Sequence, residues 1–493
     1  MTFKTLRDRQ QTLLLPPALD DYVGPDHEVR SIDEFVRSFD LEEKGFTRTG
    51  TLESGAGQPQ YPAEPLLALY LYGYMHHIRS SRKLAELTQE NMRVRWLVRD
   101  VEISHVTINN FRRENGNALQ RLLQECIQFM LEADLIDGMV VALDGTKIKA
   151  QAGRSVLTRK QLETIEGAAH QEAADYLAVL ETTENDEPPP PRLAKAIAQF
   201  GGIEGVKEYI ARKEQEAADA HRLQEESGDA QYIAPNDPEA RLMLTRNGKM
   251  PAYNVQVGVD GKHNLIVHQE VTQDANDTYQ LERQVNAMRA TLPTLGAVTV
   301  DAGYISYDAI VRYERAHYDD PRQPDVYVAL PALNMREPEG FVYDAERDLY
   351  RCPQQREMPC VQRNKIKGSS HVRVYRSISC EGCAVKSACT SAERRMIHRH
   401  IDHAMLVAHR EKIQTQKGWM FRRRRKGMSE HVNGNLKRIL GGNFLTKGLK
   451  SVAVEMSLAA AAYNLKRILK ILPGEMLRKI LQKRCDRRLA IQT

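Results

Sequence analysis

After an irregular start, the first segment with apolar residues at helical spacing lies within residues 31–46. Four of them recur at i, i+3, i+4 and i+7 within residues 31–46 and predict a helix there: Ile32, Phe35, Val36 and Phe39. The apolar segment after Pro62 predicts a second helix, and SSRKLAELTQEN predicts a third that begins near Ser80 or Ser81. The first part of the chain is therefore expected to be helical.

Another helix is predicted after Ser104, which stands where a helix N-cap would. Thr107, Asn110 and Arg112 follow on this helix. Two interpretations stay open. The segment is either a helix-turn-helix that reads the major groove of DNA, with Arg112 and Arg113 among its contacts, or a plain helical bundle whose polar face is basic.

The pattern then changes to that of strands. Short runs rich in β-branched residues predict strands at 139–145, 252–260, 264–271, 297–303 and 326–331, with GKH as a hairpin turn. Helices predicted at 279–291 and 307–317 alternate with the later strands. Residues 151–245 are polar and acidic, with helices expected on either side of a loop at PPPP (188–191). This order predicts an α/β fold, a mixed sheet with helices packed on it.

A cysteine-rich stretch follows, and a mostly helical region is expected from about residue 403. The predicted organisation is an N-terminal arm (1–60), a helical DNA-binding domain (61–136), a sheet core (137–150 and 246–334), an acidic insertion (151–245), a cysteine-rich insertion (335–402), a C-terminal helical part of the core (403–472) and a basic tail (473–493).

Charge is distributed unevenly over the 493 residues, although the net charge is only +5. Residues 393–493 hold 24 Lys and Arg against 7 Asp and Glu, whereas residues 161–240 hold 6 against 18. A strongly basic C-terminal fifth points to a polyanion such as nucleic acid, and a solvated basic face is the alternative. No apolar run approaches the ~20 residues of a membrane span, and the N-terminus lacks an apolar signal core, so a soluble, cytoplasmic protein is expected.

Two aspartates end predicted strands in similar settings. Asp144 closes VVAL before Gly145, and Asp301 closes AVTV before Ala302-Gly303. Carboxylates at the ends of neighbouring strands can chelate Mg²⁺, which prefers one or two carboxylates and retains several waters. The alternative for each is an ordinary Asp-Gly turn.

A third carboxylate, Glu430, stands in a basic segment seven residues before Lys437, so both would project from one helix face. The alternative is a Glu that only balances charge. The cations expected to contact phosphates here are Arg422, Arg423, Arg424, Arg425, Lys426, Lys437 and Arg438.

Several segments in order resemble one family. LDGTKIKA, TVDAGYIS and Glu430 with Lys437 are similar to the three acidic motifs of DDE transposases from bacterial insertion sequences. YPAEPLLALYLYGYMHHIRSSRKLAEL, ARLMLTRNGKMPAYNVQVGVD, NLIVHQEVTQDANDTYQL and FLTKGLKSVAVEMSLAAAAYNLKRIL resemble their other segments, so that the match spans residues ~15–472. The resemblance is strongest to the insertion sequence "eleven-eighty-two" family.

The resemblance implies an RNase H-like catalytic core in which Asp144, Asp301 and Glu430 bind two Mg²⁺ or Mn²⁺ ions. It also implies cleavage and transfer of DNA strands at element ends by a homodimer or higher oligomer on double-stranded DNA. The family has a Tyr and an Arg before the Glu, where this chain has Arg423 and Lys426. Two alternatives remain, a catalytically inactive DNA-binding relative and a general RNase H-like nuclease.

Five of the seven cysteines fall between residues 352 and 389. Cys380-x-x-Cys383 has zinc-knuckle spacing, and Cys352 and Cys389 would complete a four-thiolate structural zinc site, with Cys360 left over. Reduced cysteines in a small insertion are the alternative.

Aromatic and histidine residues border the basic segment. Trp419 and Phe421 are expected either to stack on an unpaired base or, for at least one of them, to pack in the core. A solvated helix face is the preferred interpretation of the four histidines His398, His400, His403 and His409.

Overall fold

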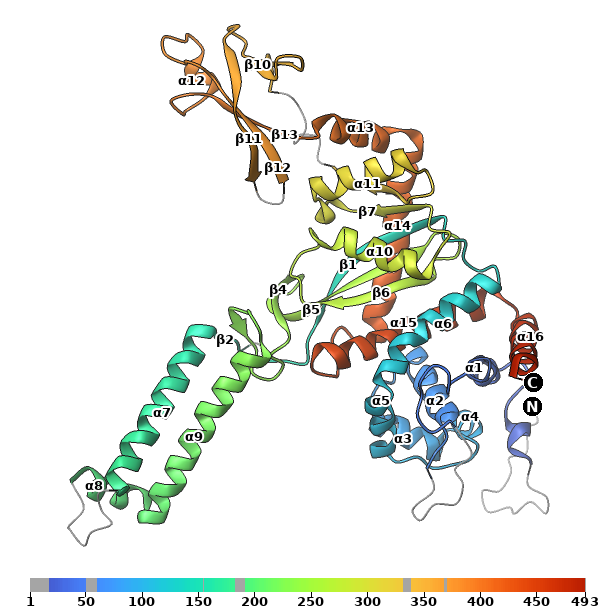
Figure 1. Cartoon of the computed structure of the whole chain (residues 1–493). Coiled ribbons are helices and arrows are strands. Elements are labelled where there is room, and N and C mark those ends of the chain that lie inside the picture. Colours follow the sequence, from blue (N-terminus) through green and yellow to red (C-terminus); the bar gives the residue numbers. More distant parts are fainter. Residues whose placement is uncertain are drawn as a thin grey trace, which may run out of the picture. The chain divides into compact units, whose positions relative to one another are not determined.

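The computed structural model describes residues 17–49, 60–153, 155–181, 191–330, 338–367 and 370–492 (Figure 1). The chain forms two compact units. The helical unit takes the residues up to Phe129 together with Leu436–Gly442 and Ala453–Thr493, and the sheet unit takes Met130–Asn435 and Asn443–Val452. No helix among the described residues is long and apolar enough to cross a membrane.

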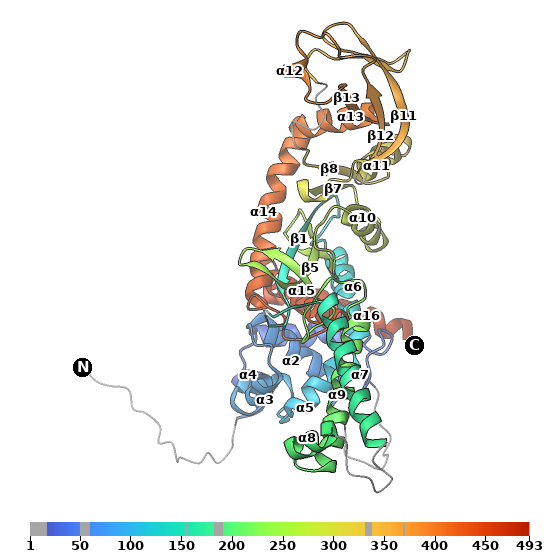
Figure 2. The ribbon, with the colours of Figure 1, turned by 90° about the vertical axis from the view of Figure 1, so that its left-hand side faces the viewer.

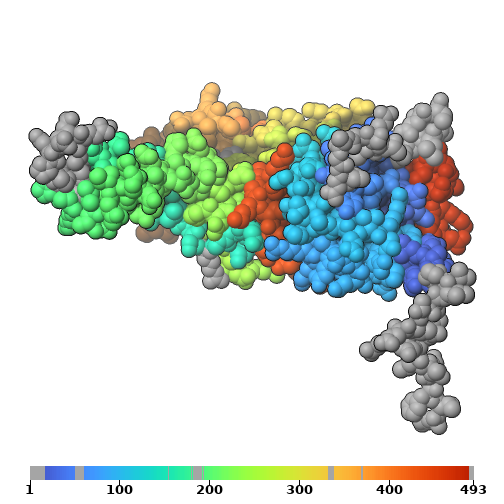
Figure 3. Space-filling model, turned by 90° about the horizontal axis from the view of Figure 1, so that it is seen from below, coloured from blue at the N-terminus to red at the C-terminus, as the bar shows by residue number. Residues whose placement is uncertain are grey.

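The helical unit combines helices from both ends of the chain. They are the 3₁₀ helix η1 (Leu19–Tyr22) and helices α1 (Glu28–Arg37), α2 (Ala63–Met75), α3 (Ser81–Glu90), α4 (Met92–Leu97), α5 (His105–Glu114), α6 (Gly116–Glu132), α15 (Leu449–Ile471) and α16 (Gly474–Gln492). Helix α2 is buried along almost its whole length, which explains its unbroken apolar sequence. Figure 3 shows the surface formed by the N-terminal helices in blue and α16 in red.

The predicted N-terminal helices are confirmed, with small differences at their ends. Helix α1 ends at Arg37, and Phe39 lies beyond it but still packs on Phe35, with ring centroids 4.7 Å apart. The hydroxyl of Ser104 caps α5 by accepting from the backbone N–H of Thr107. Hydrophobic spacing thus located the helices, and burial continues past the end of α1.

A mixed sheet forms the centre of the sheet unit. Its strands are β1 (Val140–Lys149), β4 (Arg241–Thr245), β5 (Gly248–Asp260), β6 (Ile266–Thr272), β7 (Ala297–Val300) and β8 (Asp325–Val328). The order is β4-β5-β1-β7-β8, and β6 pairs with β5. Strands β1, β7 and β8 are parallel, whereas β5 runs antiparallel to β1, β4 and β6. The predicted mixed sheet is therefore present.

Helices α10 (Gln280–Thr291), α11 (Tyr307–Asp319), α13 (His403–Gln414) and α14 (Gln416–Ile439) accompany this sheet (Figure 2). Phe421 of α14 is buried against Tyr327 of β8, with the ring centroids 4.8 Å apart. This contact confirms the prediction that at least one of Trp419 and Phe421 packs in the core.

The acidic insertion is helical. It consists of α7 (Arg159–Glu181), α8 (Pro191–Phe200), α9 (Ile203–Glu226) and the short strands β2 (Leu157–Thr158) and β3 (Tyr232–Ile233). Helices α7 and α9 lie side by side (Figure 1) and bury a small apolar cluster with α8. Of the predicted PPPP breaker, Pro188–Pro190 lie outside the described residues, and Pro191 begins α8.

The cysteine-rich insertion contains a second sheet that the sequence did not predict. Its five strands, in the order β13-β12-β11-β10-β9, are β9 (Val342–Asp344), β10 (Leu349–Arg351), β11 (Glu357–Lys367), β12 (Ser370–Arg376) and β13 (Met396–His400). Helix α12 (Lys386–Cys389) follows β12. Most of β11 is exposed, so the alternation of apolar and polar residues that reveals a half-buried strand is missing there.

Strand β1 also differs from expectation, because it does not end at Asp144. Pairing with β5 continues as far as Lys149, so Asp144 and Gly145 lie within the strand and not in a turn. A Cβ at Gly145 would lie only 2.4 Å from Oδ1 of Asp277. The glycine is therefore explained by the close approach of another carboxylate.

Candidate active site and its surroundings

Two of the predicted acidic residues lie on neighbouring parallel strands. Ala142 of β1 is opposite Thr299 of β7, so Asp144 and Asp301 follow two residues beyond the last paired position of this ladder. Asp301 directly follows β7 and caps the 3₁₀ helix η2 (Ala302–Tyr304), where its carboxylate accepts from the N–H of Gly303 at 2.8 Å. The strand register thus places the two aspartates side by side.

A third aspartate, Asp277, joins them from the segment between β6 and α10, and the sequence analysis did not select it. Its Oδ1 accepts from the side-chain amides of Asn254 at 2.7 Å and Gln256 at 2.6 Å. Both amides come from β5 and are fully buried. Two polar residues at alternate positions of an otherwise apolar strand, AYNVQVGVD, were the signal that this strand faces a buried polar partner.

The three carboxylates affect one another electrostatically. Burial raises the pKa of Asp144 to about 6, and the negative charges of Asp301 and Asp277 add to the rise, while Arg425 opposes it. The same carboxylates, after burial itself, help to hold the pKa of the Tyr304 hydroxyl well above its usual value. The site therefore concentrates negative charge that the protein compensates only in part.

Helix α14 contributes the groups nearest to Asp144. Asn433 donates from Nδ2 to Oδ2 of Asp144 at 3.0 Å, and Arg425 lies with Nη1 3.9 Å from Oδ1. The Oδ1 of Asn433 and the hydroxyl of Ser429 are buried and have no hydrogen-bond partner among the described residues. These groups are polar, enclosed and incompletely satisfied, which is the state of a site that takes a ligand.

Glu430 lies on the same helix, three residues before Asn433, and its side chain is exposed. Among the described residues no hydrogen bond or ion pair connects it to Asp144 or Asp301. Lys437 follows on the same continuous helix, as the spacing predicted. The structure therefore brings Asp144 and Asp301 together with Asp277, and it places Glu430 on the helix that contacts Asp144.

These residues fit a divalent cation in their chemistry. Partly uncompensated carboxylates and an amide oxygen without a partner are the hard oxygen ligands that Mg²⁺ prefers. Within the described ranges, no three His, Cys, Asp or Glu side chains already surround one metal position. Mg²⁺ needs only one or two protein carboxylates, because water and substrate phosphates supply the other ligands.

A basic groove of about 700 Å³ borders α14 on another side. Its lining includes Trp419, Arg423 and Arg424 of α14 and Lys262 of the β5–β6 turn. Trp419 is half exposed, and the guanidinium of Arg423 lies 5.2 Å from its ring centroid. Arg424 donates to the carbonyl of Gly261. Of the remaining predicted cations on α14, Lys426 and Arg438 are exposed, whereas Arg422 and Lys437 are half-buried.

The two arginines predicted on α5 differ in exposure. Arg113 is exposed, whereas Arg112 is half-buried and donates to Oδ1 of Asn109 at 2.9 Å. Arg113 is therefore the more accessible of the two cations for a phosphate.

Four cysteines of the second sheet meet at one small cavity. Cys352, Cys380, Cys383 and Cys389 all line it, and the backbone N–H of Arg395 donates to Sγ of Cys380 at 3.5 Å. These are the four thiols that the sequence selected, while Cys360 lies outside this lining. Among the described residues, no three of these cysteines already surround one metal position.

The histidines do not form a solvated helix face, and that interpretation is wrong. His398 and His400 belong to β13, and His403 and His409 belong to α13. His400 is buried and bonds through Nε2 to Asp308 at 2.8 Å. His409 is buried as well and bonds through Nδ1 to Glu314 at 2.6 Å, because α13 packs on the sheet.

Comparison with known proteins gives matches to transposase families. A family model described as "Transposase DDE domain" matches residues 351–469, and one described as "Transposase domain (DUF772)" matches residues 17–114. The first match includes Glu430 but neither Asp144 nor Asp301. Together the two matches support a DDE transposase.

No curated protein matches the chain. Among solved structures, the cryo-EM structure of a piggyBac transposase synaptic complex with hairpin DNA is similar at 9% sequence identity and a TM-score of 0.29, covering 94% of this chain and 80% of that one. A likeness at this TM-score carries no argument about mechanism.

Proposed function

We propose that this protein is a transposase that binds the ends of an insertion sequence and catalyses metal-dependent cleavage and transfer of DNA strands. The observation that carries the proposal is the juxtaposition of Asp144 and Asp301 on neighbouring parallel strands, beside the basic helix α14. We place the protein in the insertion sequence "eleven-eighty-two" family, on the sequence resemblance described above.

The strand order supports an RNase H-like core. Strands β6, β5 and β1 form an antiparallel series, and β1, β7 and β8 continue it as a parallel series. Asp144 and Asp301 then lie on the central strand and on its parallel neighbour. This is the placement expected if the first two acidic motifs hold a common cation.

Asp144, Asp301 and Glu430 would hold two Mg²⁺ or Mn²⁺ ions in this proposal, with Asp277 as a further carboxylate. When bound, such ions would supply Lewis-acid chemistry to the scissile phosphate and the attacking oxygen. The protein's residues position the strand: Asn433 orients Asp144 through its amide, and Arg425 offers a cation to a phosphate oxygen. Water would first attack the phosphate at the element end and break its bond to the 3′ oxygen. The freed 3′-hydroxyl would then attack a target phosphate and release the 3′ oxygen of the target strand.

The cations along α14 would contact the DNA backbone. Arg423, Arg424 and Lys426 are exposed on α14, the helix that also contacts Asp144, and Trp419 gives the groove a surface on which a base can stack. Joining two ends in one reaction calls for at least a dimer on double-stranded DNA. Arg113 on α5 would add a phosphate contact from the helical unit.

The direct test is a titration of Mg²⁺ or Mn²⁺ against nicking of DNA that carries the inverted repeats flanking the gene. Cleavage at the repeat ends that depends on the metal is expected, with scrambled repeats as the control. Equal cleavage of both DNAs would instead identify a general nuclease. Binding without cleavage at any metal concentration would identify an inactive DNA-binding relative.

We also propose a structural zinc ion held by Cys352, Cys380, Cys383 and Cys389. Support comes from the four thiols that line one small cavity, since tetrahedral sites with four thiolates are typical of structural zinc. Native mass spectrometry is expected to find one zinc ion per chain. Cys383→Ser should lose it, and Cys360→Ser should keep it. A folded wild-type protein without zinc would refute the site.

A further inference from the structure

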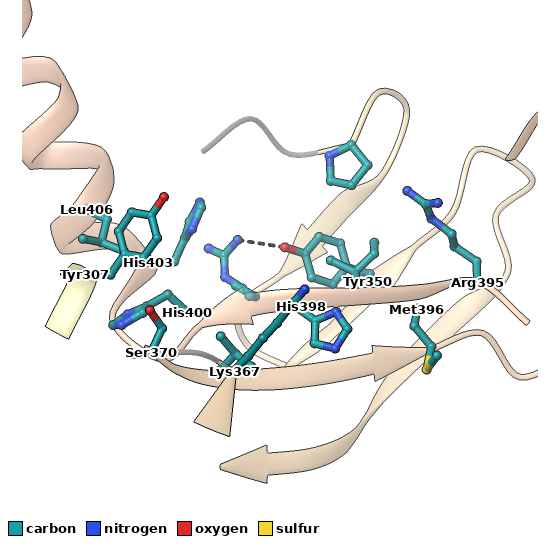
Figure 4. A pocket seen from close by; sticks show the side chains of 14 residues that line it. Tyr307, Tyr350, Lys367, Ser370, Arg395, Met396, His398, His400, His403 and Leu406 are labelled. Atoms are coloured by element: carbon teal, nitrogen blue, oxygen red, sulfur yellow. Dashed lines mark hydrogen bonds between the residues drawn. The ribbon is translucent and has the colours of Figure 1, made fainter. Parts of the chain in front are cut away.

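Another cavity, of about 480 Å³, lies between the second sheet and the helices of the core (Figure 4). Its walls come from α11, β10, β12, β13 and α13, together with Lys367 at the end of β11. The volume is within the ~300–1,000 Å³ of typical ligand pockets. None of its residues belongs to the carboxylate site described above.

Positive charge dominates this cavity. Lys367, Arg395 and Arg399 line it together with three histidines, and none of the described lining residues is acidic. Burial lowers the pKa of His398, and the positive charges of Lys367 and Lys365 lower it further. The charge of the lining therefore favours an anionic ligand.

Two tyrosines, Tyr307 and Tyr350, also line the cavity. Tyr350 is buried and accepts at its hydroxyl from Arg399 at 2.9 Å. The guanidinium of Arg399 lies 3.9 Å from the ring centroid of Tyr343, so its position is fixed by both tyrosines. Tyr307 is half-buried at the end of the cavity where Figure 4 also shows His403. Cations next to aromatic rings are the combination that binds nucleotides.

Some side chains of the lining are held by hydrogen bonds to neighbouring residues, and others are available to bind a ligand. His400 is held by Asp308, which also bonds to His371 at 2.9 Å. Lys367 and His398 form no ion pair with any other described residue, and Figure 4 shows them next to each other. These two side chains are therefore the groups that a phosphate can reach without breaking an existing ion pair.

Arg395 connects this cavity to the cysteine cavity, because it lines both. It donates to the carbonyl of Cys389 at 3.0 Å, and its Nε is buried without a hydrogen-bond partner among the described residues. The segment that holds the four thiols thus also forms one wall of the basic cavity.

We propose that this cavity binds one nucleotide unit of a DNA strand, with the phosphate against Lys367 and His398 and an unpaired base against Tyr307. This inference rests on the proposed function in one respect, because it takes DNA as the ligand. It adds a contact for a strand outside the carboxylate site, built by the cysteine-rich insertion.

The first experiment measures binding of full-length protein to fluorescent DNA with a single-stranded overhang. All variants carry Asp144→Asn, so that cleavage does not interfere. The pair Lys367→Ala with His398→Ala is expected to weaken binding about tenfold and to reduce the salt slope by about one. Arg363→Ala, at an exposed position of the same strand outside the lining, is the matched control. Equal losses in both, or no loss in the pair, would overturn the proposal.

The second experiment tests the base. Tyr307→Leu keeps an apolar side chain and is expected to weaken binding to the overhang DNA about fivefold, while binding to fully paired DNA stays unchanged. Equal effects on the two DNAs would count against a base contact. Inorganic phosphate and a nucleoside monophosphate serve as competitors. Equal competition by the two would show a simple anion site and overturn the proposal.

The third experiment locates the contact directly. DNA with 4-thiothymidine in the overhang is cross-linked to the protein, and the linked peptide is identified by mass spectrometry. Linkage to Tyr307 or within residues 396–403 is expected, and linkage only elsewhere would contradict the proposal. Normal cleavage by Asp144→Asn would refute the proposed catalytic function, yet it would leave the cross-linking result standing, so the two failures are distinguishable.

Discussion

Two groups of acidic residues in the sheet unit differ in how far neighbouring cations and hydrogen-bond donors compensate their charge. Asp144 is enclosed near Asp301 and Asp277, with one arginine at 3.9 Å, and its pKa is raised to about 6 by burial first and by these charges second. Asp325, at the start of β8, instead has Lys412 at 2.8 Å and accepts from the Tyr327 hydroxyl at 2.7 Å.

Glu314 completes the second group. It bonds to Lys412 and to His409, and although burial acts to raise the pKa of Glu314, these hydrogen bonds and charges bring it below its usual value. The pKa of Asp325 is lowered in the same manner, against the effect of burial. Paired buried acids of this kind hold the fold together. Acids left partly uncompensated point to a ligand, because a structural role would have supplied them with partners.

Cleavage is where the two groups should differ most. Asp144→Asn or Asp301→Asn is expected to reduce metal-dependent nicking about a thousandfold or more, because the cation loses a ligand while the fold is kept. Asp325→Asn should retain nicking per folded molecule and lose stability instead. Nicking assays on the purified proteins, normalised to folded protein by circular dichroism, check this. Similar losses from all three variants would remove the distinction.

The stability of the fold should depend more on the paired group, Glu314 and Asp325, than on the group around Asp144. Lys412→Ala leaves Glu314 and Asp325 without their shared cation and is expected to lower the free energy of unfolding by about 3–5 kcal/mol. Lys417→Ala removes a largely exposed ammonium 3.5 Å from Asp325 and should cost about 0.5 kcal/mol. Urea unfolding of both variants measures the difference. Equal midpoints would show that the pairing is not structural.

The pH dependence sharpens the contrast further. Since the folded pKa of Asp144 lies above its unfolded value of 3.8, its contribution to stability is complete below about pH 4 and is lost as the pH rises through 6. Asp144→Asn should therefore be more stable than wild type at pH 8, by about 2–3 kcal/mol, and comparable to it at pH 4. Glu314 and Asp325, with lowered pKa values, contribute stability that is lost as the pH falls below about 4.

Thermal unfolding of wild type and Asp144→Asn between pH 4 and 8 gives the measurement. Added Mg²⁺ is expected to raise the melting temperature of wild type at pH 8 and to have a smaller effect on the variant, because the cation compensates Asp144 directly. A difference between the two proteins that does not change with pH would mean that Asp144 is not strained by its neighbours.

The smallest effect concerns the spacing of the carboxylates. A Cβ at Gly145 would lie 2.4 Å from Oδ1 of Asp277, so Gly145→Ala should push Asp277 away and destabilise the protein by about 1–3 kcal/mol. Gly434 on α14 has no atom within 4 Å of the corresponding position, and Gly434→Ala should stabilise the helix by up to about 1 kcal/mol. If Gly145→Ala and Gly434→Ala had the same free energy of unfolding, Asp277 would be shown to move aside for the added methyl group without cost.

Hydrophobic spacing was sufficient to predict most elements. Helices α1, α2, α3 and α5 and strands β5 to β8 lie where the apolar pattern placed them, because each buries its apolar residues within its own unit. The second sheet escaped prediction for the converse reason. Its strands are short or largely exposed, and its small core of Phe341, Tyr350, Met358, Tyr375 and Ile397 draws on residues far apart in the sequence.

The sequence by itself was sufficient to select the candidate carboxylates Asp144, Asp301 and Glu430, the four cysteines and the concentration of positive charge near Glu430, because those features depend on residue type and spacing alone. Tertiary structure decided which charges meet. The strand register sets Asp144 beside Asp301. The segment after β6 folds against two buried amides and so adds Asp277. The packing of α13 on the sheet buries His409, which was expected at the surface. Electrostatic interactions depend on distance and burial, and the folded chain fixes both.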